Sequence, residues 1–107
     1  TVEIIEELCT QARERLKRLG YTNVEVRCAD GYYGWEEHAP YDGIIVTCAP
    51  DHIPQPLVDQ LADGGRMVIP VGPPGAYQVL WLVQRRGDQV ISERKMGVAF
   101  VPLTGGH

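Results

Sequence analysis

Two carboxylates in the first third of the chain each follow a strand-like run. Glu3 lies at the end of the strand-like run 1–4, and Asp30 comes shortly after the alternating run 24–28. A carboxylate at a strand end can accept two hydrogen bonds from a ribose diol. Asp30 can also accept from the exocyclic amino group of an adenine, and Gly31 lets the backbone approach the ring closely. The pair indicates a nucleotide site, although a solvated acid at a helix start and a simple Asp-Gly turn also explain these residues.

The other reactive side chains do not form a recognisable catalytic or metal site. His38 and His52 have no carboxylate or cysteine at metal-ligand spacing, so we interpret them as polar loop residues. Cys48 lies with Thr47 and Asp51 at the end of an apolar run, where a substrate of an α/β sheet would bind. A nucleophilic thiol needs a base and an oxyanion site, and the sequence identifies neither. We therefore predict no catalytic residue and no metal ligand.

The segment 41–71 predicts the unit that positions these residues. The run 43–48 is almost unbroken in its apolar character, as in a parallel strand that is buried on both faces. Leu57, Val58 and Leu61 then predict a short helix, which the glycines at 64–65 would end. The run 67–71 returns as a second strand. A crossover of this length joins parallel strands, so the segment predicts an α/β sheet.

The flanking segments extend this sheet. Apolar residues at helical spacing predict a helix over 5–19, ended by Gly20. After a glycine- and proline-rich turn at 72–75, runs 79–83 and 90–95 predict an antiparallel hairpin, and 98–101 a last short strand. Dinucleotide-binding folds continue with parallel units, whereas an antiparallel ending is typical of the methyltransferase sheet. No GxGxxG follows a strand, and 72–75 lacks the lysine and hydroxyl of a phosphate loop.

The bulk composition sets the class of protein. The 107 residues suffice for one domain, and 44% apolar with 22% charged residues is ordinary for a globular protein. A net charge of −4 argues against nucleic acid or an anionic membrane as the main partner, and no apolar run reaches the length of a membrane span. Three cysteines, an odd number, predict a reducing compartment and hence a cytoplasmic location, with Cys28 and Cys48 as small buried strand residues.

Five motifs distributed over the chain resemble one family. They are VEIIEEL at 2–8, ARERLKRLGYTNVEVRCADGYYGW at 12–35, YDGIIVTCAP at 41–50, LADGGRMVIPVG at 61–72 and FVPLTG at 100–105. In combination they resemble the C-terminal half of the protein-L-isoaspartate O-methyltransferases. The resemblance implies an α/β, Rossmann-like methyltransferase sheet, mostly parallel with a C-terminal antiparallel hairpin. Residues 1–107 would then be the C-terminal part of a single methyltransferase domain.

The resemblance also implies a reaction and a set of site residues. The family uses S-adenosylmethionine to esterify the α-carboxylate of isoaspartyl residues in damaged proteins or peptides, and the ester collapses through a succinimide. A carboxylate is already nucleophilic at neutral pH, so catalysis would consist mainly of alignment and desolvation. By position, the cofactor-binding residues would be Glu3, Ile4, Asp30, Gly31 and Thr104. The backbone of Val101 would contact the substrate carboxylate.

The chain departs from the family pattern at its N-terminal side. We expect the family's glycine-rich loop, the strand before it and the N-terminal substrate segment to lie upstream of Thr1. The absent strand would sit between the first strand and 43–48, leaving the sheet incomplete with two unpaired edges. The partner would then be a missing N-terminal half or another copy in a homo-oligomer. The alternative function is a non-catalytic domain that self-associates through these edges; a nicotinamide-binding fragment is a third reading, against which the FVPLTG ending argues.

Overall fold

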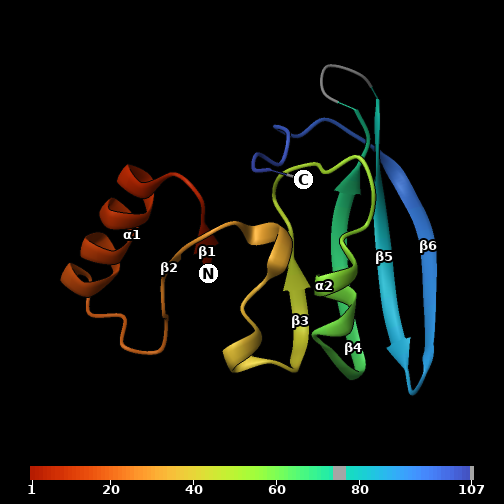
Figure 1. The fold of residues 1–107 in the computed structure, drawn as a ribbon, viewed down its shortest axis with the longest axis horizontal. Coiled ribbons are helices and arrows are strands. Elements are labelled where there is room, and N and C mark those ends of the chain that lie inside the picture. Colours follow the sequence, from red (N-terminus) through yellow and green to blue (C-terminus); the bar gives the residue numbers. More distant parts are fainter. Residues whose placement is uncertain (74–76, 107) are drawn as a thin grey trace.

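The computed structural model describes residues 1–73 and 77–106 (Figure 1). In chain order the elements are β1 (Val2–Glu3), α1 (Glu6–Arg18), β2 (Arg27–Cys28), the 3-10 helices η1 (Gly31–Tyr33) and η2 (Glu36–His38), β3 (Tyr41–Ile45), α2 (Gln55–Asp59), β4 (Leu61–Val71), β5 (Gln78–Arg86) and β6 (Gln89–Val98). Part of the turn predicted at 72–75 lies outside the described residues. Within those ranges no helix has the length and apolar character that a bilayer crossing requires.

The strands form two separate sheets. β1 and β2 pair in parallel, with Glu3 opposite Cys28. The second sheet has the order β3-β4-β5-β6, in which β3 runs parallel to β4, and β5 and β6 run antiparallel to their neighbours. The predicted α/β fold and its antiparallel ending are confirmed. The last strand predicted at 98–101 is not formed; beyond Val98, Pro102 makes a single parallel bridge to Ala49.

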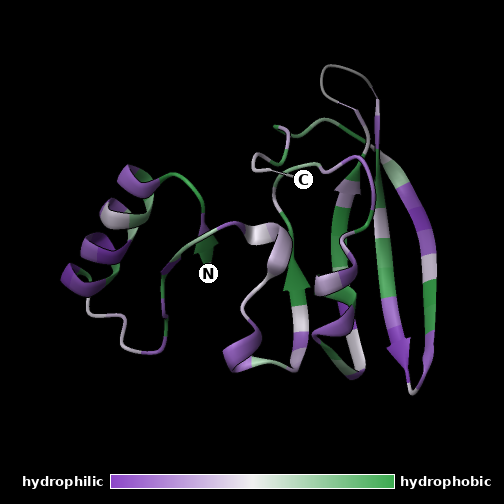
Figure 2. Cartoon of the chain, viewed as in Figure 1, coloured by the Kyte–Doolittle hydropathy of each residue, from purple (hydrophilic) through white to green (hydrophobic). Residues whose placement is uncertain are grey.

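The apolar core lies in the four-stranded sheet and the helix that covers it. The buried cluster consists of Leu57, Val58, Leu61, Met67, Ile69 and Val83. These residues come from α2, β4 and β5, and α2 lies against β4 in Figure 1. Figure 2 shows hydrophobic residues concentrated on β3 and β4, whereas β6 and α1 are largely hydrophilic. The core therefore holds the C-terminal region together.

The crossover differs from the prediction at its end. The helix stops at Asp59, and Leu61 already belongs to β4, so the glycines at 64–65 lie inside a strand and do not cap a helix. The pairing of β3 with β4 shifts register between Tyr41 and Gly43, which leaves an irregular stretch in β4. A Cβ on Gly65 would lie 2.8 Å from the carbonyl oxygen of Tyr41. The glycine permits this close approach of the two strands.

The N-terminal region has little core of its own. Helix α1 matches the predicted helix, and Gly20 with φ +83° follows its last turn as predicted. Its single buried residue is Cys9, while Ile5 and Leu8 remain about half exposed. The predicted strand 24–28 contributes only its last two residues to β2. Two short strands offer too small a surface to cover the apolar stripe of a 13-residue helix.

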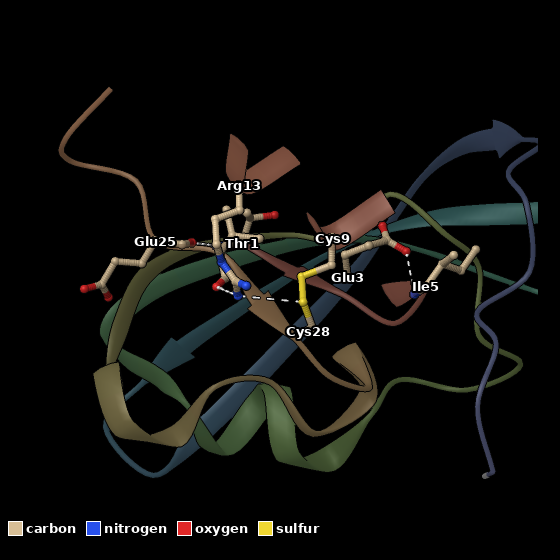
Figure 3. The surroundings of a disulfide bond; sticks show 8 residues. Thr1, Glu3, Ile5, Cys9, Arg13, Glu25 and Cys28 are labelled. Carbon is tan, nitrogen blue, oxygen red and sulfur yellow. Dashed lines mark hydrogen bonds between the residues drawn. A yellow bond between two sulfur atoms is a disulfide. The ribbon is translucent and has the colours of Figure 1, made fainter. Parts of the chain in front are cut away.

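A disulfide joins Cys9 of α1 to Cys28 of β2, with their Cα atoms 5.5 Å apart (Figure 3). The prediction of Cys28 as a small buried strand residue was wrong, because Cys28 is exposed and its sulfur forms a disulfide. The guanidinium of Arg13 adds a hydrogen bond to the Val26 carbonyl at 2.9 Å and a weaker one to the Cys28 sulfur. These links fasten the helix to the small sheet.

The outer edge of β3 is not covered by another strand among the described residues. Ile45 is 79% exposed, so the prediction of a strand buried on both faces was wrong for this position. The radius of gyration is 14.4 Å, compared with ~13 Å for a compact domain of this length. Both observations follow from the separation of the two sheets.

Candidate functional site

A cavity of about 1100 Å³ lies between the two sheets. Its wall is formed by β1, the loop that contains η1 and η2, β3 and the segment 101–104. Five of the six residues predicted to bind cofactor or substrate line it: Glu3, Ile4, Gly31, Val101 and Thr104. Elements that are distant in sequence therefore bring most of the predicted site to one place.

Glu3 lies at the end of β1, where the chain turns into α1. Its Oε1 accepts a hydrogen bond of 3.1 Å from the backbone N–H of Ile5, just before the helix (Figure 3). A carboxylate at this point complements the positive end of the helix dipole. The predicted role as an acid at a helix start is therefore present, and the bond also fixes the orientation of a side chain that lines the cavity.

Asp30 has a similar local arrangement after β2. Its Oδ1 accepts a hydrogen bond of 3.0 Å from the backbone N–H of Tyr32 and caps η1. The aspartate is not part of the cavity wall, but the next residue, Gly31, is. Both predicted carboxylates thus use one oxygen to accept an N–H from two residues further along the chain. Each is held in place by its own backbone.

Both predicted carboxylates act electrostatically on the thiol of Cys48. Burial raises the pKa of Cys48, and the negative charges of Glu3 and Asp30 raise it further. Charges act in this way only over short distances. Glu3 and Cys48, which comes three residues after β3, line the same cavity. A raised pKa keeps the thiol protonated near neutral pH, which is the opposite of what a nucleophilic cysteine requires.

The C-terminal segment reaches the same cavity through backbone contacts. The backbone N–H of Ala49 donates to the Val101 carbonyl at 2.7 Å, and the Ala49 carbonyl accepts from the N–H of Leu103 at 3.0 Å. Val101 is 69% exposed, and within the described part of the chain its N–H donates no hydrogen bond. Thr104 follows on the cavity wall. The geometry thus presents a backbone donor beside the end of β3.

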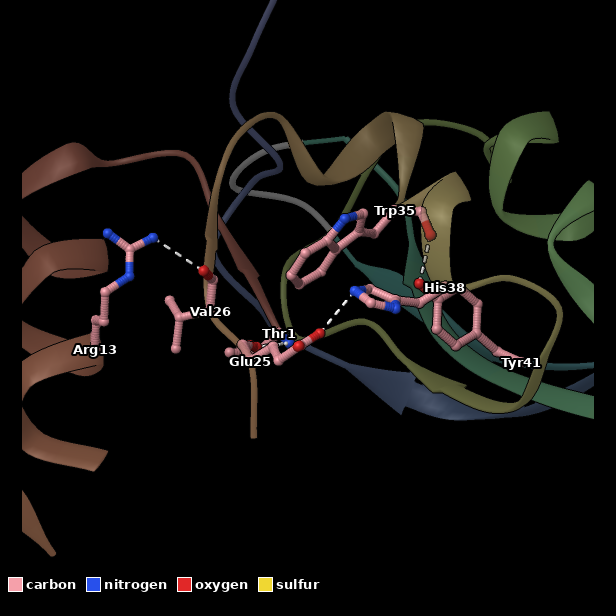
Figure 4. Close-up of polar contacts among 7 residues, drawn as sticks. All are labelled: Thr1, Arg13, Glu25, Val26, Trp35, His38 and Tyr41. Carbon is pink, nitrogen blue, oxygen red and sulfur yellow. Dashed lines mark hydrogen bonds and ion pairs between the residues drawn. The ribbon is translucent and has the colours of Figure 1, made fainter. Parts of the chain in front are cut away.

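Each of the two histidines in the loops lies beside a carboxylate. His38 Nε2 lies 2.6 Å from Glu25 Oε2, with Trp35 against its ring (Figure 4). His52 Nδ1 lies beside Asp51, and its Nε2 is 2.8 Å from the Tyr32 hydroxyl. Among the described residues no three histidine, cysteine or acidic side chains gather as metal ligands. The histidines connect segments that are distant in sequence, Glu25 with His38 and Tyr32 with His52.

Two residues near the site had no recognisable signal in the sequence. Gln60 and Gln78 are buried glutamines that hold, respectively, the loop after Asp30 and the segment before Val101. Their partners lie 22 to 27 positions away in the chain, so no local motif marks them. A polar residue directly before an apolar strand, as at both positions, is the only available hint.

A sequence model of the family Protein-L-isoaspartate(D-aspartate) O-methyltransferase (PCMT) matches residues 1–107. Among curated proteins, protein-L-isoaspartate O-methyltransferase 2 of Polaromonas sp. is 61% identical over 106 residues, covering 98% of this chain and 50% of that protein. The protein of the same description from Syntrophobacter fumaroxidans is 60% identical over 108 residues, covering all of this chain and 44% of that protein. The chain spans about half the length of these relatives.

Solved structures give the same result for the fold. A structure titled protein-L-isoaspartate O-methyltransferase superposes with a TM-score of 0.89 at 33% identity, covering 97% of this chain and 33% of that one. A Plasmodium falciparum PCMT in complex with S-adenosyl-L-homocysteine gives a TM-score of 0.76 at 26% identity, covering 96% of this chain and 50% of that one. The resemblance carried by the five motifs is confirmed, and the chain belongs to the protein-L-isoaspartate O-methyltransferase family.

Proposed function

We propose that this chain forms the ribose and adenine side, and part of the substrate side, of a protein-repair methyltransferase. The enzyme would transfer a methyl group from S-adenosylmethionine to the α-carboxylate of L-isoaspartyl residues in proteins or peptides. One observation carries the proposal: four of the five predicted cofactor residues, Glu3, Ile4, Gly31 and Thr104, line one cavity of about 1100 Å³ between the two sheets. A carboxylate at the end of one strand and a glycine turn after the next suit a ribose and an adenine.

The residues present fit such a cofactor. The cavity volume of about 1100 Å³ is at the upper end of the range for small-molecule sites. Glu3 and Asp30 are oriented by backbone N–H groups, so little conformational freedom would be lost when they accept hydrogen bonds from a ligand. Ile4 and Thr104 would contribute apolar and hydroxyl contacts on the same wall. The partial exposure of Glu3 leaves the carboxylate accessible.

In this proposal the chain's residues bind and align rather than exchange protons. S-adenosylmethionine would supply a methyl group on a positively charged sulfur, and transfer would form a carbon–oxygen bond while the carbon–sulfur bond breaks and its electron pair stays on sulfur. Glu3 would accept from the ribose hydroxyls, and Asp30 with Gly31 would hold the adenine. The Val101 N–H would donate to the substrate carboxylate. Rate acceleration would come from alignment and from exclusion of water.

A second candidate function is assembly through strand edges. Among the described residues β1 pairs only with β2, and β3 on its outer side has no partner, so both strands offer an edge to the cavity. Ile45 beside it is 79% exposed. Such edges are templates for pairing with another chain. This candidate predicts two or more chains in solution and negligible affinity for the cofactor.

Calorimetric titration of the purified 107-residue chain with S-adenosylhomocysteine distinguishes the two candidates. The molecular mass is measured in the same sample by light scattering. Saturable binding that is lost in Asp30→Ala, and retained in the matched exposed control Asp88→Ala, supports the cofactor site. No binding, with a mass of two or more chains, favours assembly and contradicts cofactor binding by this chain.

A further inference from the structure

The buried polar side chains among the described residues are two glutamines. Gln60 is 8% exposed and follows α2, and Gln78 is 2% exposed and begins β5. A buried amide must satisfy both its carbonyl oxygen and its NH₂ group, because an unpaired polar atom in the interior is costly. Each of these amides uses both ends on the backbone of one distant loop. They are therefore placed to fix that loop relative to the large sheet.

Gln60 holds the loop that follows Asp30. Its Oε1 accepts from the N–H of Trp35 at 3.0 Å, and its Nε2 donates to the carbonyl of Tyr33 at 2.8 Å. Gly34 lies between the two held residues with φ +64°, a conformation that favours glycine. A Cβ at Gly34 would lie 2.2 Å from Oε1. The glycine thus makes room for the amide.

Gln78 holds the segment that precedes Val101 in the same manner. Its Oε1 accepts from the N–H of Phe100 at 2.6 Å, and its Nε2 donates to the carbonyl of Phe100 at 2.9 Å. Here too a glycine provides the space: a Cβ at Gly72 would lie 2.8 Å from the Cα and 2.9 Å from the Cγ of Gln78. Ala49 holds the next carbonyl, that of Val101.

We propose that Gln60 is a positioning residue for the cofactor half of the site and Gln78 a positioning residue for the substrate half. The inference rests on the proposed function, because Gln60 sets the loop of Asp30 and Gly31 whereas Gln78 sets the backbone of Val101. The two amides bond to different segments and share no partner. Loss of one should therefore disturb one ligand and spare the other. A general contribution to folding would weaken both together.

The test first measures the two loops without any ligand. Gln60→Met and Gln78→Met keep an apolar side chain of similar size and remove the amide; Gln89→Met, on exposed β6, is the matched control. Hydrogen exchange of individual amides is followed by NMR. Gln60→Met should speed exchange at Trp35 roughly tenfold and leave Phe100 within about twofold. Gln78→Met should do the reverse. Equal changes at both amides in either variant, or none, would overturn the proposal.

A protonation rescue separates positioning from packing. A carboxylate at position 60 can accept from Trp35 but cannot donate to Tyr33, whereas a protonated carboxyl group can do both. The second carboxylate oxygen would repel the Tyr33 carbonyl oxygen and displace the side chain, so Gln60→Glu should lose protection of Trp35 at neutral pH and regain it, relative to the wild type, as the solution is acidified. Absence of such recovery while the rest of the sheet keeps its protection would contradict the two-bond arrangement.

The ligand measurements use S-adenosylhomocysteine and an isoaspartyl hexapeptide as probes, each titrated calorimetrically. Gln60→Met should lower the affinity for S-adenosylhomocysteine at least tenfold and the affinity for the peptide by less than about twofold. Gln78→Met should show the opposite pattern. Parallel weakening of both probes overturns the assignment of halves. If the wild-type chain binds neither probe, the proposed function fails for this chain, and the exchange data still decide whether the two glutamines position their loops separately.

Discussion

The two sheets of this chain are stabilised in different ways. The sheet β3–β6 with α2 contains the buried cluster of apolar side chains, whereas β1, α1 and β2 bury only Cys9 fully. The small sheet is fastened instead by a disulfide, by hydrogen bonds from Arg13 and by the bond from the Thr1 amino group to the Glu25 carbonyl. The comparison teaches that the two sides of the proposed cofactor site do not share one source of rigidity.

The difference bears directly on function. Glu3 and Asp30 belong to the region with little core, while Cys48 and the segment around Val101 lie against the large sheet. Opening of the small sheet would move the proposed ribose and adenine contacts and leave the substrate contacts in place. Regions with few buried apolar contacts open at a lower free-energy cost than the global unfolding of the protein.

The largest effect is expected from a cavity in the large sheet. Ile69→Ala removes a fully buried side chain of β4 and should lower the free energy of unfolding by roughly 2–5 kcal/mol. Urea unfolding followed by far-UV circular dichroism measures the loss. Val90→Ala, at a residue of β6 that is 47% exposed, is the matched control and should change the value by less than about 0.5 kcal/mol. Equal costs for both variants would show that β4 does not carry the core.

The next effect separates the two regions by covalent chemistry. Reduction of Cys9–Cys28, or the double change Cys9→Ser with Cys28→Ser, opens a loop of 19 residues and should destabilise α1 by about 3 kcal/mol. Hydrogen exchange should rise in α1 and stay unchanged in β4. Cys48→Ser leaves the disulfide intact and should leave the α1 amides protected. A uniform rise in both regions would mean that they unfold as one unit.

A third experiment tests whether the two regions meet at Cys48. With the disulfide formed, Cys48 is the free cysteine, so iodoacetamide reports on its thiolate alone. Burial and the charges of Glu3 and Asp30 raise its pKa, so alkylation should set in at higher pH than for an ordinary thiol. Because the folded pKa lies above the unfolded one, the corresponding contribution to stability is present below the unfolded pKa and is lost as pH rises through the folded value.

The charge of Glu3 can be removed to test its effect on the alkylation rate of Cys48. Glu3→Gln should lower the pKa of Cys48 and speed its alkylation severalfold at mildly alkaline pH. Asp51→Asn changes an exposed acid three residues from Cys48 that does not act on the thiol, and the rate should stay the same. If both variants alkylate at the wild-type rate, the small sheet does not face the end of β3 in solution.

Much of this arrangement could be predicted from local patterns in the sequence. The helix α1, the parallel unit β3–α2–β4 and the antiparallel ending all follow from apolar periodicity and from turn residues. The site residues were found through strand ends and through a family resemblance, and the structure brings five of the six to one cavity. Their binding roles stay predictions.

What the sequence did not predict depends on contacts between distant segments. The partner of Cys28 cannot be chosen from three cysteines by spacing. The glycines at 64–65 fit a helix cap and a strand irregularity equally well until the position of Tyr41 is known. Gln60 and Gln78 are ordinary polar residues in the sequence, and only the burial of their amides against remote backbone reveals a role.

The smallest effect is expected from the ion pair between Glu25, in the segment before β2, and His38 of η2. Glu25 and His38 approach to 2.6 Å, but their side chains are 65% and 42% exposed, so solvent screens the attraction. Glu25→Gln should lower the free energy of unfolding by less than about 1 kcal/mol, and added salt should reduce the difference further. Chemical unfolding at low and high ionic strength measures it, with Glu36→Gln as a control on the same rim. A cost comparable to that of disulfide reduction would mean that this exposed ion pair stabilises the N-terminal region as much as the covalent bond does.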